Sequence, residues 1–139
     1  MTVKRTARYN LVIADDDSAF REVLRSIFEP WFELFEAASG EQVVEIVEFQ
    51  TVDLVVLDMH MEELTGLETI EIVKRIDSSL PCILVTANAD EAREQAEEVD
   101  VWSILPKPVR KNDLLFTVSR AIDSAYGDPD VFARRNSLN

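Results

Sequence analysis

Carboxylate, hydroxyl and ammonium side chains stand at the ends of several short apolar runs in this sequence. The aspartates 15–17 follow the first run, Asp58 the third, Thr86 closes the fourth and Lys107 follows the fifth. Carboxylates crowded together repel, and a hard cation such as Mg²⁺, which prefers oxygen ligands, removes that repulsion. A lysine and a hydroxyl nearby would hold a phosphoryl group, and a carboxylate can act as a nucleophile that forms an acyl phosphate. These residue types indicate metal-assisted phosphoryl transfer, provided that the fold brings them together.

The apolar runs and the segments between them alternate between two kinds of pattern. Short apolar runs predict strands, and apolar residues at helical spacing predict helices. The expected strands are 10–14, 32–37, 52–58, 81–86 and 101–105, and the expected helices are 20–28, 39–49, 67–76, 89–99 and 112–126. Asp17 or Ser18 is expected to cap the first helix.

Strand and helix thus alternate five times, which predicts an α/β domain. The pattern indicates a five-stranded parallel sheet, order 2-1-3-4-5, with helices on both faces and right-handed crossovers. Pro106 lacks a backbone N–H, so the fifth strand should lie at a sheet edge. In such sheets the ligand site lies at the carboxyl ends of the strands, where strands 1 and 3 are neighbours. Asp15, Asp16, Asp58, Thr86 and Lys107 should therefore meet there.

Length and composition limit the classes of function. With 139 residues the chain suits one domain, and we expect a flexible N-terminus at 1–8, the domain at 9–126 and a C-terminal tail at 127–139. The net charge of −13 argues against nucleic-acid binding and favours metal cations and basic partner surfaces. We see neither a membrane-spanning apolar stretch nor a signal peptide, and the single Cys82 fits a reducing compartment, so a cytoplasmic location is expected.

The order and spacing of these residues resemble the receiver domain of two-component response regulators. The resemblance rests on Asp15-Asp16, Asp58, Thr86-Ala87 and Lys107-Pro108, and it extends over about residues 9–126. It implies that Asp58 accepts a phosphoryl group from a phosphohistidine on a sensor histidine kinase or a histidine phosphotransfer protein. It also implies that a protein-interaction surface then switches, and that the chain promotes only its own phosphorylation and dephosphorylation.

The resemblance also assigns the other site residues. Asp15, Asp16, Asp58 and the backbone carbonyl of His60 would bind Mg²⁺. Lys107, whose bond to Pro108 would be cis, would contact the phosphoryl oxygens, and Thr86 would move towards the phosphoryl group. The partners would be the phosphodonor and an unknown output protein or domain. Neither nucleic acid nor membrane is expected to bind, and the protein should be a monomer or a phosphorylation-dependent dimer.

Three positions depart from the family pattern. Ile104 stands where the family often has a tyrosine or phenylalanine, which puts the usual aromatic switch in doubt unless Trp102 replaces it. Glu62-Glu63 stands where a Pro-Gly pair is usual, and Val109 stands where phenylalanine is common. None of the three removes a residue needed for phosphorylation.

Other interpretations of the same residues remain. A haloacid-dehalogenase-like phosphatase also uses Asp-x-Asp after its first strand, and Asp15 would then be the nucleophile. A flavodoxin would need a hydroxyl-rich phosphate loop where this chain has aspartates 15–17. A receiver-like docking module that is never phosphorylated is the third alternative, and Ile104 keeps it open.

Overall fold

The computed structural model describes residues 8–133, in which strands and helices alternate along the chain. The strands are β1 (Asn10–Ala14), β2 (Glu33–Ala37), β3 (Leu54–Asp58), β4 (Cys82–Thr86) and β5 (Ser103–Pro106), and the helices are α1 (Ser18–Phe28), α2 (Gly40–Phe49), α3 (Gly66–Ile76), α4 (Ala89–Gln95) and α5 (Lys111–Tyr126). All strand pairs are parallel, in the order β2-β1-β3-β4-β5. The predicted fold class and strand order are confirmed.

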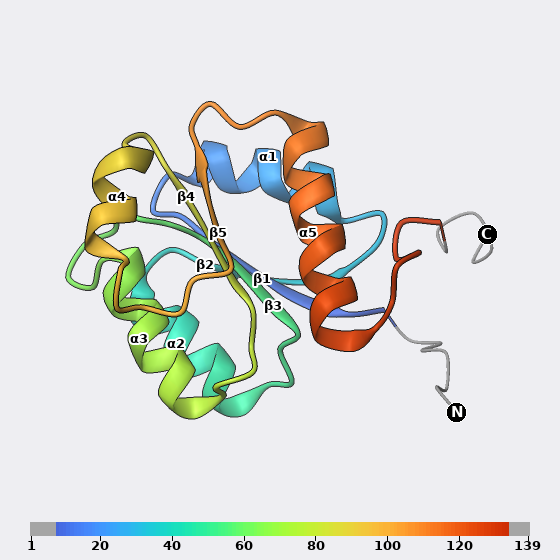
Figure 1. The fold of residues 1–139 in the computed structure, drawn as a ribbon, viewed down its shortest axis with the longest axis horizontal. Helices are drawn as coiled ribbons and strands as arrows, with labels where there is room; N and C mark the ends of the chain where they lie inside the picture. The colour runs from blue at the N-terminus through green and yellow to red at the C-terminus, as the bar shows by residue number, and fades with distance from the viewer. Residues whose placement is uncertain (1–7, 134–139) are drawn as a thin grey trace.

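Helices cover both faces of the sheet (Figure 1). Helices α1 and α5 lie on one face, and α2, α3 and α4 lie on the other. Because successive side chains of a strand point to opposite faces, each strand feeds two cores. In β3, Leu54 and Val56 join the cluster under α1 and α5, while Val55 and Leu57 join the cluster under α2 and α3.

The central strands are buried throughout, which explains their continuous apolar runs. Every residue of β3 and β4 is buried, whereas only the last residue of the edge strand β2 is fully buried. In register, Ala14 lies beside Leu57, Asp58 beside Val85 and Thr86 beside Pro106. The carboxyl ends of β1, β3, β4 and β5 therefore meet at one edge of the sheet.

Local capping bonds fix where the helices begin. Asp17 caps α1, and its side chain accepts the amide N–H of Ala19. Ser39 caps α2, and its side chain accepts the amide N–H of Gln42, while the side chain of Gln42 accepts the N–H of Ala38. Thr65 and Glu68 form a complete capping box at the start of α3. This capping box fixes where α3 begins, at the end of the loop that follows Asp58.

Most elements differ from their predicted bounds by one or two residues, and the largest difference is at the end of α4. Helix α4 ends at Gln95 rather than at 99, and the chain continues in turns, one of which is closed by a hydrogen bond from Val99 N to Ala96 O. Ala96 and Val99 pack against the core from these turns rather than from a further helical turn. Strand β5 begins at Ser103 rather than at 101 and lies at the sheet edge, as expected for a strand that ends in Pro106.

The segment after α5, expected to be a tail, packs against the domain over its described part. Val131 is 3% exposed, and the indole N–H of Trp31 donates to the carbonyl of Phe132 at 3.0 Å. Most of the expected flexible N-terminus, residues 1–7, lies outside the described residues, as do 134–139 of the expected tail. Within residues 8–133, none of the helices has the length and apolar character needed to cross a membrane.

Candidate functional site

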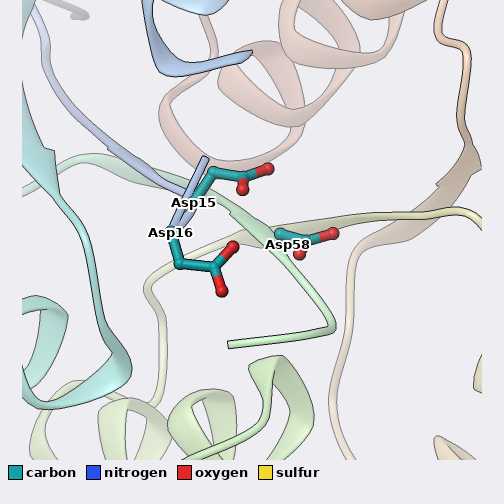
Figure 2. Close-up of side chains that lie close together, drawn as sticks. All are labelled: Asp15, Asp16 and Asp58. Carbon is teal, nitrogen blue, oxygen red and sulfur yellow. The ribbon is translucent and has the colours of Figure 1, made fainter. Parts of the chain in front are cut away.

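Three aspartate side chains from two neighbouring strand ends converge at the carboxyl edge of the sheet (Figure 2). Asp15 and Asp16 follow β1, and Asp58 is the last residue of β3. One oxygen from each of the three carboxylates lies within 4.8 Å of the others. Asp15 and Asp58 are buried, while Asp16 is exposed. The structure thus brings together the three aspartates that the sequence predicts as metal ligands.

The turn between β1 and α1 holds the Asp15 carboxylate in place. Asp15 is 1% exposed, and its Oδ1 accepts the amide N–H of Asp17 at 2.9 Å. Its backbone carbonyl accepts an N–H from the Arg21 guanidinium at 2.6 Å. The cap residue of α1 and the first buried carboxylate of the site are therefore positioned by one turn.

Lys107 bridges the two buried carboxylates. Its ammonium lies 2.9 Å from Asp15 Oδ2 and 3.1 Å from Asp58 Oδ1. The ring centroid of Phe20, in the first turn of α1, lies 4.2 Å from the same ammonium. Burial lowers the pKa of Lys107, but the hydrogen bonds to Asp15 and Asp58 and their negative charges together raise it by more, so the pKa is raised overall. Lys107 is therefore a permanent cation at the site.

The environment of Asp58 makes it easier to protonate than a solvated aspartate. Burial raises the pKa of Asp58 above its ordinary value, and the negative charge of Asp15 raises it further. The hydrogen bond and positive charge of Lys107, with a smaller effect of His60, offset part of this increase in the pKa. A bound cation would favour the charged carboxylate, which is the nucleophilic form.

Of the other two predicted site positions, one closes β4 and the other lies on the loop after β3. Thr86 is fully buried at the end of β4, and its hydroxyl accepts the amide N–H of Asn88, the residue that caps α4. His60 is exposed on the loop two residues after Asp58. The bond between Lys107 and Pro108 is cis, as expected.

The donor set fits a hard divalent cation. It consists of carboxylate oxygens, two of them on buried side chains, without sulfur or imidazole among the three clustered residues. Mg²⁺ is bound in proteins by one or two carboxylates together with water and phosphate oxygens. The acidic pocket can therefore hold a metal ion, and its oxygen donors are of the kind that Mg²⁺ prefers.

The structure also shows the surroundings of two of the departures from the family pattern. The amide of Trp102 donates to the carbonyl of Cys82, so Trp102 lies at the opposite end of the sheet from Thr86 and cannot replace the aromatic residue missing at Ile104. Ile104 itself packs against the core under α2, α3 and α4. Glu63, at the usual glycine position, has a φ of 64°, which is the left-handed conformation.

Two residues that contact the site are missed by sequence reasoning. Helical spacing places Phe20 only on the apolar face of α1, with the same signal as its core-facing neighbours, and it does not single out Arg21. Nothing in the pattern shows that the Phe20 ring reaches Lys107, which is distant in sequence.

Comparisons with known proteins agree with this geometry. The family model described as "Response regulator receiver domain" matches residues 11–119. The cyclic di-GMP phosphodiesterase response regulator RpfG of Xanthomonas campestris is 31% identical over 135 residues, which are 93% of this chain and 36% of that protein. Sporulation initiation phosphotransferase F of Bacillus subtilis is 30% identical over 100 residues, 70% of this chain and 81% of that protein. The transcriptional regulatory protein ZraR of Escherichia coli is 28% identical over 115 residues, 81% of this chain and 26% of that protein.

Solved structures show the same fold. The signal receiver domain of an HD domain-containing protein from Pseudomonas fluorescens has a TM-score of 0.81 at 19% identity, covering 88% of this chain and all of that one. A CheY-like response regulator receiver domain protein from Methanospirillum hungatei also has a TM-score of 0.81, at 23% identity, covering 86% of this chain and 97% of that one.

The length of the match differs among the relatives. This chain spans about a quarter of ZraR and about a third of RpfG, but most of phosphotransferase F. What the relatives share with this chain is the receiver unit, and the fold of this chain is that of a receiver domain. The chain belongs to the response regulator receiver domain family, the phosphoacceptor modules of two-component signal transduction.

Proposed function

We propose that Asp58 is the phosphoacceptor, that Lys107 and Thr86 contact or respond to the phosphoryl group, and that Asp15, Asp16, Asp58 and the backbone carbonyl of His60 bind Mg²⁺. One observation supports this most strongly. The Asp58 carboxylate stands at the end of the central strand, 3.1 Å from the Lys107 ammonium and inside the cluster of three carboxylates.

The chemistry of such a site follows from its charges. An Asp58 oxygen attacks the phosphorus of a phosphohistidine, a P–O bond forms, and the P–N bond breaks with its electron pair going to the imidazole. Lys107 exchanges its bond to Asp58 for one to a phosphoryl oxygen, which stabilises the transferred negative charge. Mg²⁺, when bound, would share the charge of the carboxylates and phosphoryl oxygens.

The same geometry argues against Asp15 as a nucleophile. Its Oδ1 accepts the N–H of Asp17, its Oδ2 accepts the N–H of Lys107, and the side chain is 1% exposed. Both Asp15 oxygens therefore already accept a hydrogen bond, whereas the contact of Lys107 with Asp58 is to Oδ1. Asp58 is 6% exposed and lies at the strand end that faces the loops. The phosphatase alternative is not favoured.

The proposal extends to the partners. The donor is a sensor histidine kinase or a histidine phosphotransfer protein in the cytoplasm, and the only chemistry that this chain promotes is its own phosphorylation and dephosphorylation. The output is a protein or domain that recognises the phosphorylated receiver, with the receiver either monomeric or dimeric on phosphorylation.

Phosphorylation by a small donor tests the proposal without knowledge of the kinase. With Mg²⁺ and acetyl phosphate the natural chain should gain one phosphoryl group, detected as the mass of the intact protein, and Asp58→Asn should gain none. Asp123→Asn, at an exposed position of α5, is the matched control and should label like the parent. Undiminished labelling of Asp58→Asn would show that another residue accepts the phosphoryl group.

A further inference from the structure

An aromatic ring lies against the ammonium that bridges the two buried carboxylates. The Nζ of Lys107 is 4.2 Å from the ring centroid of Phe20 and donates to Asp15 and Asp58. A cation within about 6 Å of a ring face is attracted by the quadrupole of the ring. The ammonium is therefore held by two anions and one aromatic face, and the Lys107 side chain is only 24% exposed.

We propose that Phe20 is a positioning residue for phosphoryl transfer. Its ring keeps the Lys107 ammonium close to the place that the phosphoryl oxygens would occupy. The inference rests on the proposed function, in which Asp58 is the acceptor and Lys107 its cationic partner.

The reaction sets a particular demand on Lys107. While it binds Asp58, the ammonium withdraws charge from the nucleophile, so this bond must be released as the P–O bond forms. An aromatic face attracts the positive charge but accepts no strong N–H bond. The ring of Phe20 can therefore retain the cation near the site while its N–H donor exchanges from the carboxylate to a phosphoryl oxygen.

The turn before α1 couples the position of the ring to that of the carboxylates. Phe20 is the third residue of α1, after the cap residue Asp17, whose amide binds Asp15 Oδ1. The next residue, Arg21, binds the Asp15 carbonyl at 2.6 Å. The ring and the carboxylate that share Lys107 are thus placed by the same short segment.

Phe20 also packs against the core under α1 and α5, so its effect on packing must be separated from its effect on Lys107. Ring fluorination separates the two effects. Replacing Phe20 site-specifically by its 4-fluoro, 3,4-difluoro and 3,4,5-trifluoro analogues weakens the electrostatic attraction step by step and leaves the shape of the ring almost unchanged. The measurement is the rate constant of phosphorylation by acetyl phosphate at fixed Mg²⁺.

The rate constant should fall with each fluorine, by about twofold to fivefold over the series, which is the range of a cation–π contact at a partly exposed site. The rate constant of Phe20→Leu should fall by at least as much. Phe20→Trp, whose indole has a stronger cation-binding face, should retain the parental rate constant. The matched control is Phe116, whose ring lies 5.7 Å from the Arg120 guanidinium on α5, and the same fluorinated series there should leave the rate unchanged.

The outcomes distinguish this inference from the function on which it rests. If the parent is phosphorylated on Asp58 and the fluorinated series at Phe20 is flat, or if Phe20→Trp is as slow as Phe20→Leu, the positioning role is wrong and the acceptor role stands. If the parent gains no phosphoryl group on Asp58, the proposed function itself fails.

Discussion

Asp16 carries the least compensated charge of the acidic cluster. Lys107 pairs with Asp15 and Asp58, whereas Asp16 has no ion pair within residues 8–133. Two like charges about 5 Å apart at an effective dielectric of about 20 repel by roughly 3 kcal/mol before screening and relaxation, so a net effect of up to about 1 kcal/mol is reasonable. Asp16→Asn is therefore expected to raise the free energy of unfolding in EDTA by that amount, measured by urea denaturation.

The response to Mg²⁺ completes this test. The natural chain should gain about 1.4 kcal/mol at ten times the dissociation constant of the metal, and Asp16→Asn should gain much less because a ligand is lost. Asp17→Asn is the control, since asparagine caps a helix as well as aspartate does and Asp17 lies outside the cluster. A full Mg²⁺ response in Asp16→Asn would show that the three carboxylates do not form one metal site.

The raised pKa of Asp58 predicts how stability depends on pH. A carboxyl group whose pKa is higher in the folded state binds its proton more tightly there, so its contribution to stability is full below the ordinary pKa of 3.8 and is lost as the pH rises through the raised pKa. In EDTA, the free energy of unfolding of Asp58→Asn minus that of the parent should increase between pH 4 and pH 7. A difference that shrinks over this range would contradict the electrostatic description of the site.

Sequence patterns predict some of the site residues and not others. Asp15, Asp58, Thr86 and Lys107 were predictable as neighbours, because each closes or follows a strand and parallel strands end at one edge. Phe20 was not, because a residue with helical spacing is assigned to the core, and its contact with Lys107 arises only because the start of α1 and the loop after β5 lie at the same edge of the sheet.

At the scale of elements, the loop between β3 and α3 contains a strained residue. Glu63 has a φ of 64°, a conformation that costs a residue with a side chain about 1 kcal/mol relative to glycine. Glu63→Gly should therefore raise the free energy of unfolding by about that amount in urea denaturation. Glu62→Gly, next to it but without a positive φ, should lower the stability. Equal effects of the two substitutions would show that the backbone of Glu63 stores no strain.

The elements differ in how well the sequence defines them. The strands β3 and β4 were predictable nearly to the residue because both faces are buried and the apolar runs are continuous. The C-terminal end of α4 and the start of β5 were not, because the segment between them mixes acidic and apolar residues without a clear helical or strand period. Contacts with the rest of the molecule therefore decide where each element ends.

At the scale of the whole molecule, the segment after α5 is part of the folded domain. Its Val131 is buried beside the core under α1 and α5, and the ring of Phe132 packs edge-on against Trp31, with centroids 5.0 Å apart. Sequence alone did not indicate this, because 127–133 is short and has no period.

This packing predicts a measurable contribution to stability. Val131→Ala removes the buried apolar surface of two methyl groups and should lower the free energy of unfolding by about 1 to 2 kcal/mol. Val23→Ala makes the same change at a residue that is 52% exposed and should alter stability by less than about 0.5 kcal/mol. Urea denaturation of both variants decides the point. A neutral Val131→Ala would mean that the segment is not held against the domain.

The location of the phosphoryl group tests the central claim most directly. After phosphorylation of the natural chain with acetyl phosphate and Mg²⁺, borohydride reduces an aspartyl phosphate to homoserine, and peptide mass spectrometry identifies the position. Asp58, at the end of β3 beside Lys107, should be the reduced residue, with Asp15 and Asp16 unchanged. Homoserine at position 15, or at any aspartate outside the cluster, would contradict the assignment of Asp58 as the phosphoacceptor.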